Sequence, residues 1–461
     1  MGEAESGEVF YATLLRFAGC AATSHEIAQG LGGDDVAVRA GGDLVDPTEP
    51  GAMAALLAAL GIDAGTLTAL GGVRWIGRLY AEGARADCEV GAGLTRRLHL
   101  PSTVTRAVSE GLERWDGHGA PAGLAGEDIA VPARVAAVAF AAVMFDAVGG
   151  RDAAVAAVTR WSGRALEPAL ADVFLEDAGE LLALSDPDDV WAAAVAAEPQ
   201  PRRLFRNDAA LDDALAGFGD AADLKTPWFH GHSGGVAGLA RDAAQLLGSV
   251  DPVMLHRAAL LHDLGRVAVP TGIWERPGRL RPQDWELVRL HPYQSARILA
   301  RSPVLAPLAN VVGRHHERLD SSGYPSGVGA AELDHAAGLL AAADVLHALT
   351  EPRPHRAALD LAAAAGVMGD LPLRREEISA VLAAADAPRP AFAPLPAELT
   401  ARELDVLKLL ADGLTKQAIA DRLHVSYSTV HTHTVHIYAK CQVSTRAGLA
   451  MFAMRHGLLT R

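Results

Sequence analysis

The sequence has few of the residues that cross-link or stiffen small proteins rich in β-structure. Cysteine occurs three times in 461 residues, at Cys20, Cys88 and Cys441, and no two of them form a CxxC pair. This spacing supports neither a disulfide framework nor a zinc finger, and it fits a reducing cytoplasm. Aromatic residues make up 5% of the chain, whereas half of it is apolar and rich in Ala, Leu and Val. Because no convincing alternating strand pattern occurs either, we expect an all-α fold.

Long hydrophobic runs are also missing. The longest uncharged apolar run, VAAVAFAAVMF from Val135, is far shorter than the roughly 20 residues that span a bilayer. The first ten residues, MGEAESGEVF, have neither the basic stretch nor the apolar core of a signal peptide. We therefore expect a cytoplasmic protein with no membrane partner, in which the run from Val135 forms a core helix.

Positive charge is scarce overall but gathers at the C-terminal end. The formal net charge of −15 argues against a chain that coats nucleic acid along its whole length. From Leu399 to Arg461, however, eight Lys and Arg stand against four Asp and Glu, a balance of +4, and the rest carries −19. This contrast indicates a local anionic partner for the C-terminal region.

The length indicates about three domains. The clearest linker is the Pro-rich stretch AADAPRPAFAPLPAE, because its prolines cannot hold a helix and favour an extended spacer. A second boundary lies near Ala196, where proline and charge interrupt alanine-rich helices. We predict two helical bundles and a small third helical domain, with these limits: 1–200, first bundle; 205–383, second bundle; 384–398, linker; 399–461, third domain.

Two stretches of the first two domains echo each other at a distance of 204 residues: EGLERWDGHGAPAG from Glu110 and RHHERLDSSGYPSG from Arg314. The later stretch has His315 and His316 where the earlier one has Gly111 and Leu112. The same shift places Asp87 opposite His291 and Phe140 opposite Asp344, and after a change of register Arg16 and Phe17 face His262 and Asp263. We infer an internal duplication. The first copy is expected to be a metal-free helical domain that pairs with or regulates the second copy.

The second copy concentrates imidazoles and carboxylates. Asp263 and Asp344 stand in apolar helical segments, where an unpaired carboxylate would be costly, and a metal ion removes that cost. A mixed His and Asp set without thiolates suits iron, manganese or zinc, and six or seven ligands are about right for two ions. The predicted metal ligands are His232, His262, Asp263, His291, His315, His316 and Asp344.

The segment from about Phe229 to Ala357 resembles an HD-GYP domain, a branch of the HD superfamily of metal-dependent phosphohydrolases. The matching pieces, in order, are HSGGV, LLHDLGRVAVP, RPGRLRPQDWELVRLHP, HHERLDSSGYPSG and AAADVLHALTEPRPHR. The resemblance implies an all-helical domain, a centre of two or three metals, and hydrolysis of cyclic di-GMP or a related cyclic dinucleotide. It also implies that Asp263 bridges the metals.

The same resemblance makes Asp263 and Arg266 the predicted catalytic residues. It implies that Arg353 and Arg356, three apart on a helix, hold substrate phosphate. Three positions depart from the family. Arg266 replaces a lysine, Ser321 replaces a glycine, and Trp228 stands where three-metal members carry a glutamate. The last departure favours a two-metal site.

The last sixty residues resemble a LuxR-type DNA-binding domain over their whole length, through LTARELDVLKLLADG, IADRLHVSYSTVHTHTVHIYAK and STRAGLAMFAMRHGLL. Thr400 and Glu403 form a capping box, and Ser426 could cap a helix. By analogy, residues 428–440 form the recognition helix of a helix-turn-helix, which usually binds two-fold DNA sites as a homodimer. The predicted contacts to double-stranded DNA are Lys416, Thr429, His431, Thr432, Val435, Lys440 and Arg446.

The sequence leaves three functions open. In the first, a transcription regulator of the LuxR family carries an HD-GYP-like domain that hydrolyses or senses a cyclic dinucleotide. In the second, a phosphodiesterase uses its C-terminal domain only for assembly. In the third, the HD-GYP domain is catalytically dead and only binds a ligand or metal. The departures Arg266 and Ser321 favour altered turnover, whereas the unbroken set of predicted ligands favours at least metal binding.

Overall fold

The computed structural model describes residues 3–46, 48–49, 51, 56, 58, 73–184, 189–387 and 395–459. Within these residues there is no β-strand, and two isolated bridges join Ser162 to Leu166 and Arg353 to Arg356. The all-α prediction is therefore confirmed. The chain forms two compact units, Met1–Leu211 and Asp212–Arg461, which are described separately below. The finer domain limits stay predictions.

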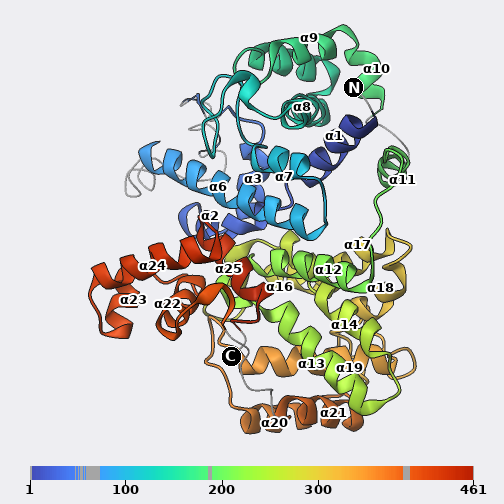
Figure 1. Cartoon of the computed structure of the whole chain (residues 1–461). Coiled ribbons are helices and arrows are strands. Elements are labelled where there is room, and N and C mark those ends of the chain that lie inside the picture. The colour runs from blue at the N-terminus through green and yellow to red at the C-terminus, as the bar shows by residue number, and fades with distance from the viewer. Residues whose placement is uncertain are drawn as a thin grey trace. The chain divides into compact units, whose positions relative to one another are not determined.

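Unit 1 is built around helices α1, α7 and α8, which lie side by side (Figure 1). They bury Ala12, Leu15, Val104, Val108 and Ala133 in one core. A second core lies where α8 meets α9 and α10. The helices of this unit are α1 (Glu3–Leu15), the 3₁₀ helix η1 (Cys20–Thr23), α2 (Ser24–Gly30), α3 (Asp35–Gly42), α6 (Val73–Arg97), α7 (Ser102–Ser109), the 3₁₀ helix η2 (Gly126–Asp128), α8 (Val131–Trp161), α9 (Pro168–Glu176), α10 (Ala178–Ala183) and α11 (Val190–Ala196).

Helix α8 contains the apolar run that the sequence placed in a core. Its 31 residues are long and apolar enough to cross a membrane by length and composition. Gly150, with φ 72° and ψ −176°, interrupts the helix, because this backbone conformation is accessible to glycine but not to helical residues. Ala133, Ala141, Ala154 and Val158 are buried in the two cores of unit 1. The helix thus serves as a core helix of this unit, as expected.

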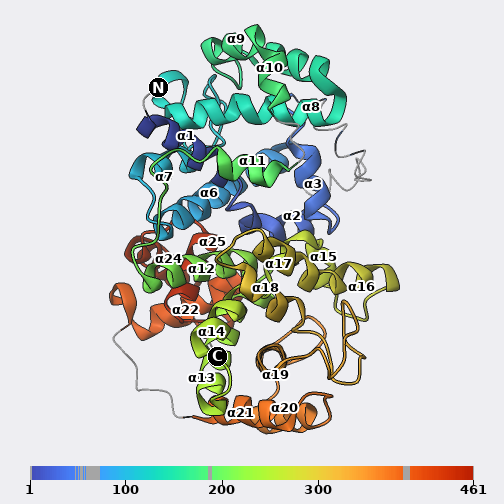
Figure 2. The same ribbon diagram turned by 90° about the vertical axis from the view of Figure 1, so that its right-hand side faces the viewer.

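Unit 2 contains a larger helical bundle in which α13 packs against α14, α19 and α21 (Figure 2). Helix α19 is buried over most of its length, as predicted for HAAGLLAAADVLHALT. The bundle consists of α12 (Asp208–Asp223), the 3₁₀ helix η3 (Pro227–Phe229), α13 (His232–Leu247), α14 (Pro252–Leu261), the 3₁₀ helix η4 (Leu264–Ala268), α15 (Thr271–Trp274), α16 (Pro282–Arg289), α17 (His291–Ala300), α18 (Ala306–Gly313), α19 (His335–Thr350), α20 (Leu361–Gly369) and α21 (Arg375–Asp386).

Three predictions from the helical pattern are wrong in this bundle: a single helix from Pro282 to Ser302, a helix end at Gly265, and a helix that carries Arg353 and Arg356. The stretch from Pro282 forms two helices, because Pro292 lacks an amide hydrogen and sits in the first turn of a new helix, α17. Gly265 does not end α14, which stops at Leu261; it lies in η4 instead. Arg353 and Arg356 are not on a helix, since α19 ends at Thr350 and the two residues face each other across an isolated bridge.

The C-terminal part of unit 2 has its own hydrophobic core, formed by residues such as Val406, Ile419, Val430, Ile437 and Leu449. The predicted capping box of Thr400 with Glu403 and the cap by Ser426 are both present. The helices are the 3₁₀ helix η5 (Pro396–Glu398), α22 (Ala401–Ala411), α23 (Lys416–Leu423), α24 (Tyr427–Cys441) and α25 (Arg446–Arg455). Within the predicted linker 384–398, residues 388–394 lie outside the described residues.

Candidate metal centre

The seven predicted ligands of the second copy come together from five helices or helix ends. His232 and His291 are the first residues of α13 and α17, His262 and Asp263 follow α14, and Asp344 lies inside α19. His315 and His316 follow α18. Six of the seven side chains are buried, and His316 is partly exposed. A helix end lets the chain turn a side chain into the bundle, which explains why most of these residues stand at helix termini.

Asp263 joins two groups of ligand atoms. Its Oδ2 lies 2.9 Å from Nε2 of His262, and its Oδ1 lies 3.2 Å from Nε2 of His291. The first group is completed by His232 and Asp344, whose Nε2 and Oδ1 are 3.0 Å apart. The second group consists of three imidazoles, those of His291, His315 and His316. A carboxylate between two such groups is positioned to bridge two ions.

Three of the imidazoles are oriented by the backbone in the same way. Nδ1 of His262 lies 2.7 Å from the carbonyl of Ala259 three residues earlier, and Nδ1 of His291 lies 2.6 Å from the carbonyl of Val288. His315 repeats this contact with Val312 at 2.6 Å. A carbonyl can only accept, so each Nδ1 is assigned as the donor and each Nε2 keeps a lone pair for the centre.

The donor set fits divalent ions. Both oxygens of Asp263 and Nε2 of His262 are buried without a hydrogen-bond partner of good geometry among the described residues, which is costly unless a cation accepts their lone pairs. Two atoms bound to one ion at about 2.1 Å lie about 3.0–3.4 Å apart. The distance of 3.4 Å between Nε2 of His291 and Nε2 of His315 is of this size. Imidazole and carboxylate ligands suit zinc, iron or manganese.

The charges of the centre also favour a cation. Burial alone would raise the pKa of Asp263, but Arg266 and His262 hold it well below its usual range. Burial and the neighbouring His262 lower the pKa of His315 to about 3. For His262, burial opposes protonation, but Asp263 and Asp344 raise its pKa to about 10. Ionised carboxylates and a neutral His315 are forms that bind metal, whereas His262 must give up a proton when an ion binds.

Sequence reasoning missed two residues that orient His232. Glu351 Oε2 lies 2.9 Å from Nδ1 of His232, and His347 Nδ1 lies 3.3 Å from the same nitrogen. A carboxylate behind a ligand imidazole fixes its orientation and raises its basicity. Their spacing in the sequence could have revealed them, because His347 lies one helical turn after Asp344 and Glu351 about one turn further, on the same side as Asp344.

His232, His347 and Glu351 also form a third group of ligand atoms. This group already contains a cation, since Nη2 of Arg353 lies 2.7 Å from Oε2 of Glu351 and 3.4 Å from Nδ1 of His232. Trp228, which stands where three-metal relatives carry a glutamate, offers its backbone carbonyl to Arg353 rather than a ligand. Arg353 thus stands beside the third group, where its guanidinium balances the charge of Glu351.

The predicted catalytic and substrate arginines differ in their surroundings. Nη1 of Arg266 lies 2.6 Å from Oδ2 of Asp263, and its guanidinium stacks 4.4 Å from the ring centre of Phe229. Arg353 lies over the same ring, 5.1 Å from its centre. Arg356 donates to the carbonyls of residues 348, 349 and 351 and so closes the end of α19. A phosphate contact by Arg356 would have to replace one of these bonds.

Two aromatic rings stand beside the second ligand group. Tyr324 stacks on His316, with ring centres 4.6 Å apart and an interplanar angle of 29°. Trp285 of α16 meets Tyr324 edge to face at 5.5 Å and is 40% exposed. The tyrosine of the GYP turn thus fixes a ligand imidazole through its ring, and the indole leaves an apolar face open next to the centre.

The predicted DNA-binding residues lie on or beside the outer face of α24. Val430, Thr434, Ile437 and Cys441 face the core. The exposed face carries the predicted residues Thr429, His431, Thr432 and Val435. An exposed face of this kind at the second helix of a helix-turn-helix can enter a major groove.

The three predicted phosphate contacts are engaged within the C-terminal region. Nζ of Lys416 lies 3.1 Å from Nδ1 of His431. Lys440 pairs with Glu403 at 2.8 Å. Arg446 donates to the carbonyls of Gly413 and Leu414. Lys440 and Arg446 thus stabilise the packing of this domain, and a contact to DNA phosphate would be a second role of these side chains.

In the first copy, the positions aligned with the ligands also converge, but their chemistry differs. Arg16 lies over the rings of Phe17 and Phe140, at 5.6 and 5.4 Å from their centres, and the two rings are 4.7 Å apart. Asp87, opposite His291, pairs with Arg39 at 2.9 Å. Among the described residues of unit 1, no group of histidine, cysteine and carboxylate atoms suited to a metal occurs.

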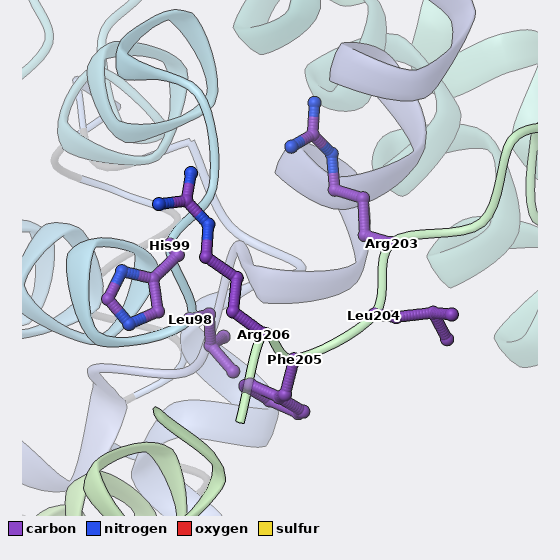
Figure 3. Close-up of a pocket in the computed structure, with 6 residues that line it drawn as sticks. All are labelled: Leu98, His99, Arg203, Leu204, Phe205 and Arg206. Carbon is purple, nitrogen blue, oxygen red and sulfur yellow. The ribbon is translucent and has the colours of Figure 1, made fainter. Parts of the chain in front are cut away.

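Unit 1 also contains a separate hollow of about 260 Å³ near the end of α6 (Figure 3). It has two arginines and a histidine but no acidic residue, and its lining gives no sign of catalytic chemistry. The lining residues are Leu98, His99, Arg203, Leu204, Phe205 and Arg206.

Comparison with known proteins supports both resemblances. The family model of the HD domain matches residues 86–157 and 218–372, so it finds a segment in each copy. The model of the bacterial regulatory proteins of the LuxR family matches residues 397–453.

Two curated relatives match the chain over different lengths. The 3′3′-cGAMP-specific phosphodiesterase 3 of Vibrio cholerae is 29% identical over 379 residues, which are 80% of this chain and 82% of that protein. A cyclic di-GMP phosphodiesterase of Pseudomonas aeruginosa is 38% identical over 128 residues, which are 27% of this chain and 31% of that protein.

A crystal structure of a cyclic GMP-AMP-specific phosphodiesterase from V. cholerae has a TM-score of 0.56 to this chain at 25% identity. The match covers 85% of this chain and 90% of the other. The fold, the two matched segments of the HD model and the match of the last domain lead to one conclusion. The chain combines an HD domain with a C-terminal domain of the LuxR family of bacterial regulatory proteins.

Proposed function

We propose that the protein is a DNA-binding regulator whose second copy hydrolyses a cyclic dinucleotide with the help of two divalent metal ions. The observation that carries this proposal is the position of Asp263 between two groups of ligand atoms, His232 with His262 and Asp344 on one side and three imidazoles on the other. Relatives named as phosphodiesterases for 3′3′-cGAMP and for cyclic di-GMP support the class of substrate.

The first group and the second group would each hold one ion, with Asp263 shared. When bound, such a pair lowers the pKa of a bound water and neutralises phosphate charge. Arg266 keeps Asp263 ionised, and Phe229 holds the guanidinium of Arg266 in place. In this proposal Arg353, beside His232, orients a substrate phosphate, and Arg356 supports the same turn.

Tyr324 and Trp285 have a different part in this proposal. The stacked phenol of Tyr324 keeps His316 in the orientation needed to bind metal. The half-exposed indole of Trp285 offers a face on which a purine of the substrate would stack. Water exclusion by these rings strengthens the electrostatic interactions of the phosphate with the centre.

Metal analysis and a hydrolysis assay on the purified full chain test this function. We expect about two equivalents of zinc, iron or manganese and conversion of 3′3′-cGAMP or cyclic di-GMP to a linear product. His315→Ala should remove one equivalent and abolish turnover. His335→Ala, at the exposed start of α19, is the matched control and should change neither. Full turnover in the His315→Ala protein would show that the catalytic assignment is wrong.

The second part of the proposal is sequence-specific DNA binding by the exposed face of α24. Its support is the match to the LuxR family and the outward position of Thr429, His431, Thr432 and Val435. In vitro selection of DNA fragments with the full chain would give a site, and fluorescence anisotropy would give the affinity. Val435→Glu places a carboxylate in the groove and should weaken binding at least about 100-fold, whereas Asp405→Asn on α22 is the control.

Contacts to DNA phosphates can be recognised by the salt dependence of binding. Lys416→Ala should weaken binding to all sequences alike and reduce the slope of log affinity against log salt by about 1. Absence of sequence-specific DNA binding by the full chain would favour the alternative in which the C-terminal domain serves assembly, and retained binding in Val435→Glu would show that another surface contacts DNA. We place the regulator in the cytoplasm as a homodimer, in line with its free cysteines and with the two-fold sites of helix-turn-helix proteins.

The catalytically dead alternative keeps the same centre but no turnover. Its basis is the exchange at Arg266 and Ser321, of which Ser321 adopts a left-handed backbone conformation with φ 62°. Metal binding without hydrolysis in the assay above would select this alternative. Ser321→Gly should then raise turnover, because glycine adopts this conformation without steric cost.

A further inference from the structure

Arg16 of the first copy carries a buried guanidinium that forms no ion pair within the described residues. The residue follows the end of α1 at Leu15. Its Nε and Nη1 are buried and make no hydrogen bond in the described part of the chain. Its close contacts are instead the rings of Phe17 and Phe140. Burial lowers the pKa of Arg16, and the nearby Cys88 and Asp43 oppose this shift.

Two other arginines of this region are paired with carboxylates. Arg39 lies 2.9 Å from Asp87. Arg114 lies 3.0 Å from Asp46 and 2.8 Å from Asp116. An unpaired buried charge costs more than the two π-faces of Phe17 and Phe140 return. Among the described residues, Asp43 interacts with Arg16 electrostatically but forms no ion pair with it, so the buried donors Nε and Nη1 of Arg16 remain open to an anion.

The position of Arg16 indicates what kind of anion this is. Arg16 aligns with the metal ligand His262, and Gly111 aligns with the ligand His315. Nη1 of Arg16 lies 3.8 Å from the point that a Cβ atom on Gly111 would occupy. The guanidinium thus fills room that imidazoles take in the second copy. Both copies would therefore carry positive charge at this aligned position. In the first copy the charge belongs to the side chain of Arg16, and in the second copy it would belong to the metal ions.

We propose that the first copy binds the phosphate ester of a nucleotide at Arg16 and does not hydrolyse it. A guanidinium presents two parallel N–H donors that match two phosphate oxygens. Phe17, which is 37% exposed, gives access to the site and an aromatic face for a base. Phe17 and Phe140 replace the two carboxylates, so this site has lost the groups that would hold a metal and activate a water. Because the first copy would not hydrolyse its ligand, the bound ligand would persist and act as a signal. The choice of a nucleotide as the ligand rests on the proposed function, whereas the anion site itself does not.

The test uses the full chain with His315→Ala, in which the second copy cannot consume the probe. Inorganic phosphate and 3′3′-cGAMP are added in separate titrations, and the melting temperature is recorded with and without Arg16→Met. With Arg16 present, we expect saturating probe to raise the melting temperature by about 2–4 °C. Arg16→Met should melt higher than its parent without probe, because a buried charge is gone. Its probe-dependent rise should be smaller than that of the parent by about 2–4 °C, because only the second copy can still bind the probe. Arg85→Met, on the exposed side of α6, is the matched control.

Equal rises in the parent and in Arg16→Met, or no rise in the parent, would overturn the proposal. If Arg16→Met fails to fold, Arg16→Lys takes its place; it keeps the charge but loses the paired donors, so at least half of the rise should disappear. The result is separable from the hydrolysis assay. A chain that hydrolyses nothing but binds through Arg16 contradicts the proposed function alone, and an active chain without Arg16-dependent binding contradicts this inference alone.

Discussion

In both copies, the glycine-rich turn is held by a glutamate at the same aligned position, which accepts hydrogen bonds from two backbone amides of the turn. Glu113 accepts hydrogen bonds from the amides of Ala122 and Leu124. Glu317 accepts them from Ser326 and Gly327 in the second copy. An added Cβ would collide with the backbone in both turns, 2.4 Å from the amide of Arg114 at Gly119 and 2.4 Å from Cα of Glu317 at Gly323.

The helix contact next to the centre is shared as well. A Cβ on Gly19 would lie 1.9 Å from the carbonyl oxygen of Asp87, and one on Gly265 would lie 2.1 Å from that of His291. These pairs are the ones that the alignment of the copies matched. What differs is the set of side chains that point inward. Backbone contacts thus keep the fold in both copies, and the side chains alone decide whether a metal can bind.

The largest effect that would separate the copies is on catalysis. His315→Ala should lower turnover at least about 1,000-fold, because a lost metal ion removes several kcal/mol of transition-state stabilisation. Gly111→Ala, at the aligned position of the first copy, should leave turnover within about twofold. The assay is hydrolysis of a cyclic dinucleotide. Equal losses of turnover from both substitutions would show that the two copies do not differ in catalysis.

The next effect concerns an arginine that both turns contain. Arg114 is buried against Asp46 and Asp116, so Arg114→Met should lower the free energy of unfolding at pH 7 by about 3 kcal/mol. Arg318 donates instead to the carbonyl of Glu317, so Arg318→Met should cost less and should not depend on pH in the same way. Chemical denaturation of the two proteins measures the difference.

The sign of the pH dependence follows from the carboxylates. Arg114 and the local hydrogen bonds lower the pKa of Asp46 and of Asp116 in spite of burial, so their contribution is present above the unfolded pKa of about 3.8. It is lost as pH falls through their lower folded values. The cost of Arg114→Met should therefore shrink as the pH falls below about 4, and a constant cost would contradict the pairing.

A smaller effect is expected behind the first ligand group. Glu351→Gln keeps the shape of the side chain but removes the charge beside His232, which should weaken metal binding about 10- to 100-fold. The position 204 residues earlier is Ala147, so the first copy lacks this support. Competition with a metal chelator measures the affinity. Glu332→Gln, at an exposed site of the same copy, should leave it unchanged.

The smallest effect should be common to both copies. Glu113→Gln and Glu317→Gln each weaken two bonds to backbone amides, and each should cost about 1–2 kcal/mol of stability. Glu317→Gln should in addition reduce turnover, because Tyr324 of the same turn stacks on His316. Glu113→Gln should leave turnover unchanged, and a loss of turnover there would mean that the first copy takes part in the reaction.

Much of this could be predicted from the sequence, since composition and helical periodicity carry the all-α fold and caps such as Thr400 mark helix starts. The seven ligand positions could be named because His and Asp side chains in apolar helical segments are costly to bury unless they bind a cation; their metal binding stays a prediction. The partners of His232 could not be foreseen, because Glu351 and His347 meet it through packing of α13 against α19. The break at Leu290 was missed because the helical periodicity continues through Pro292.

Three ligand imidazoles take their orientation from a carbonyl three residues earlier, and the first copy keeps one such position intact. Gly111 lies three residues after Val108, to whose carbonyl its own amide is bonded, at the end of α7. A histidine grafted there would receive its orientation from the existing helix. The first copy is consequently a starting point for protein engineering, in which the carbonyl of Val108, 3.2 Å from an added Cβ, must shift slightly and Arg16 must make room.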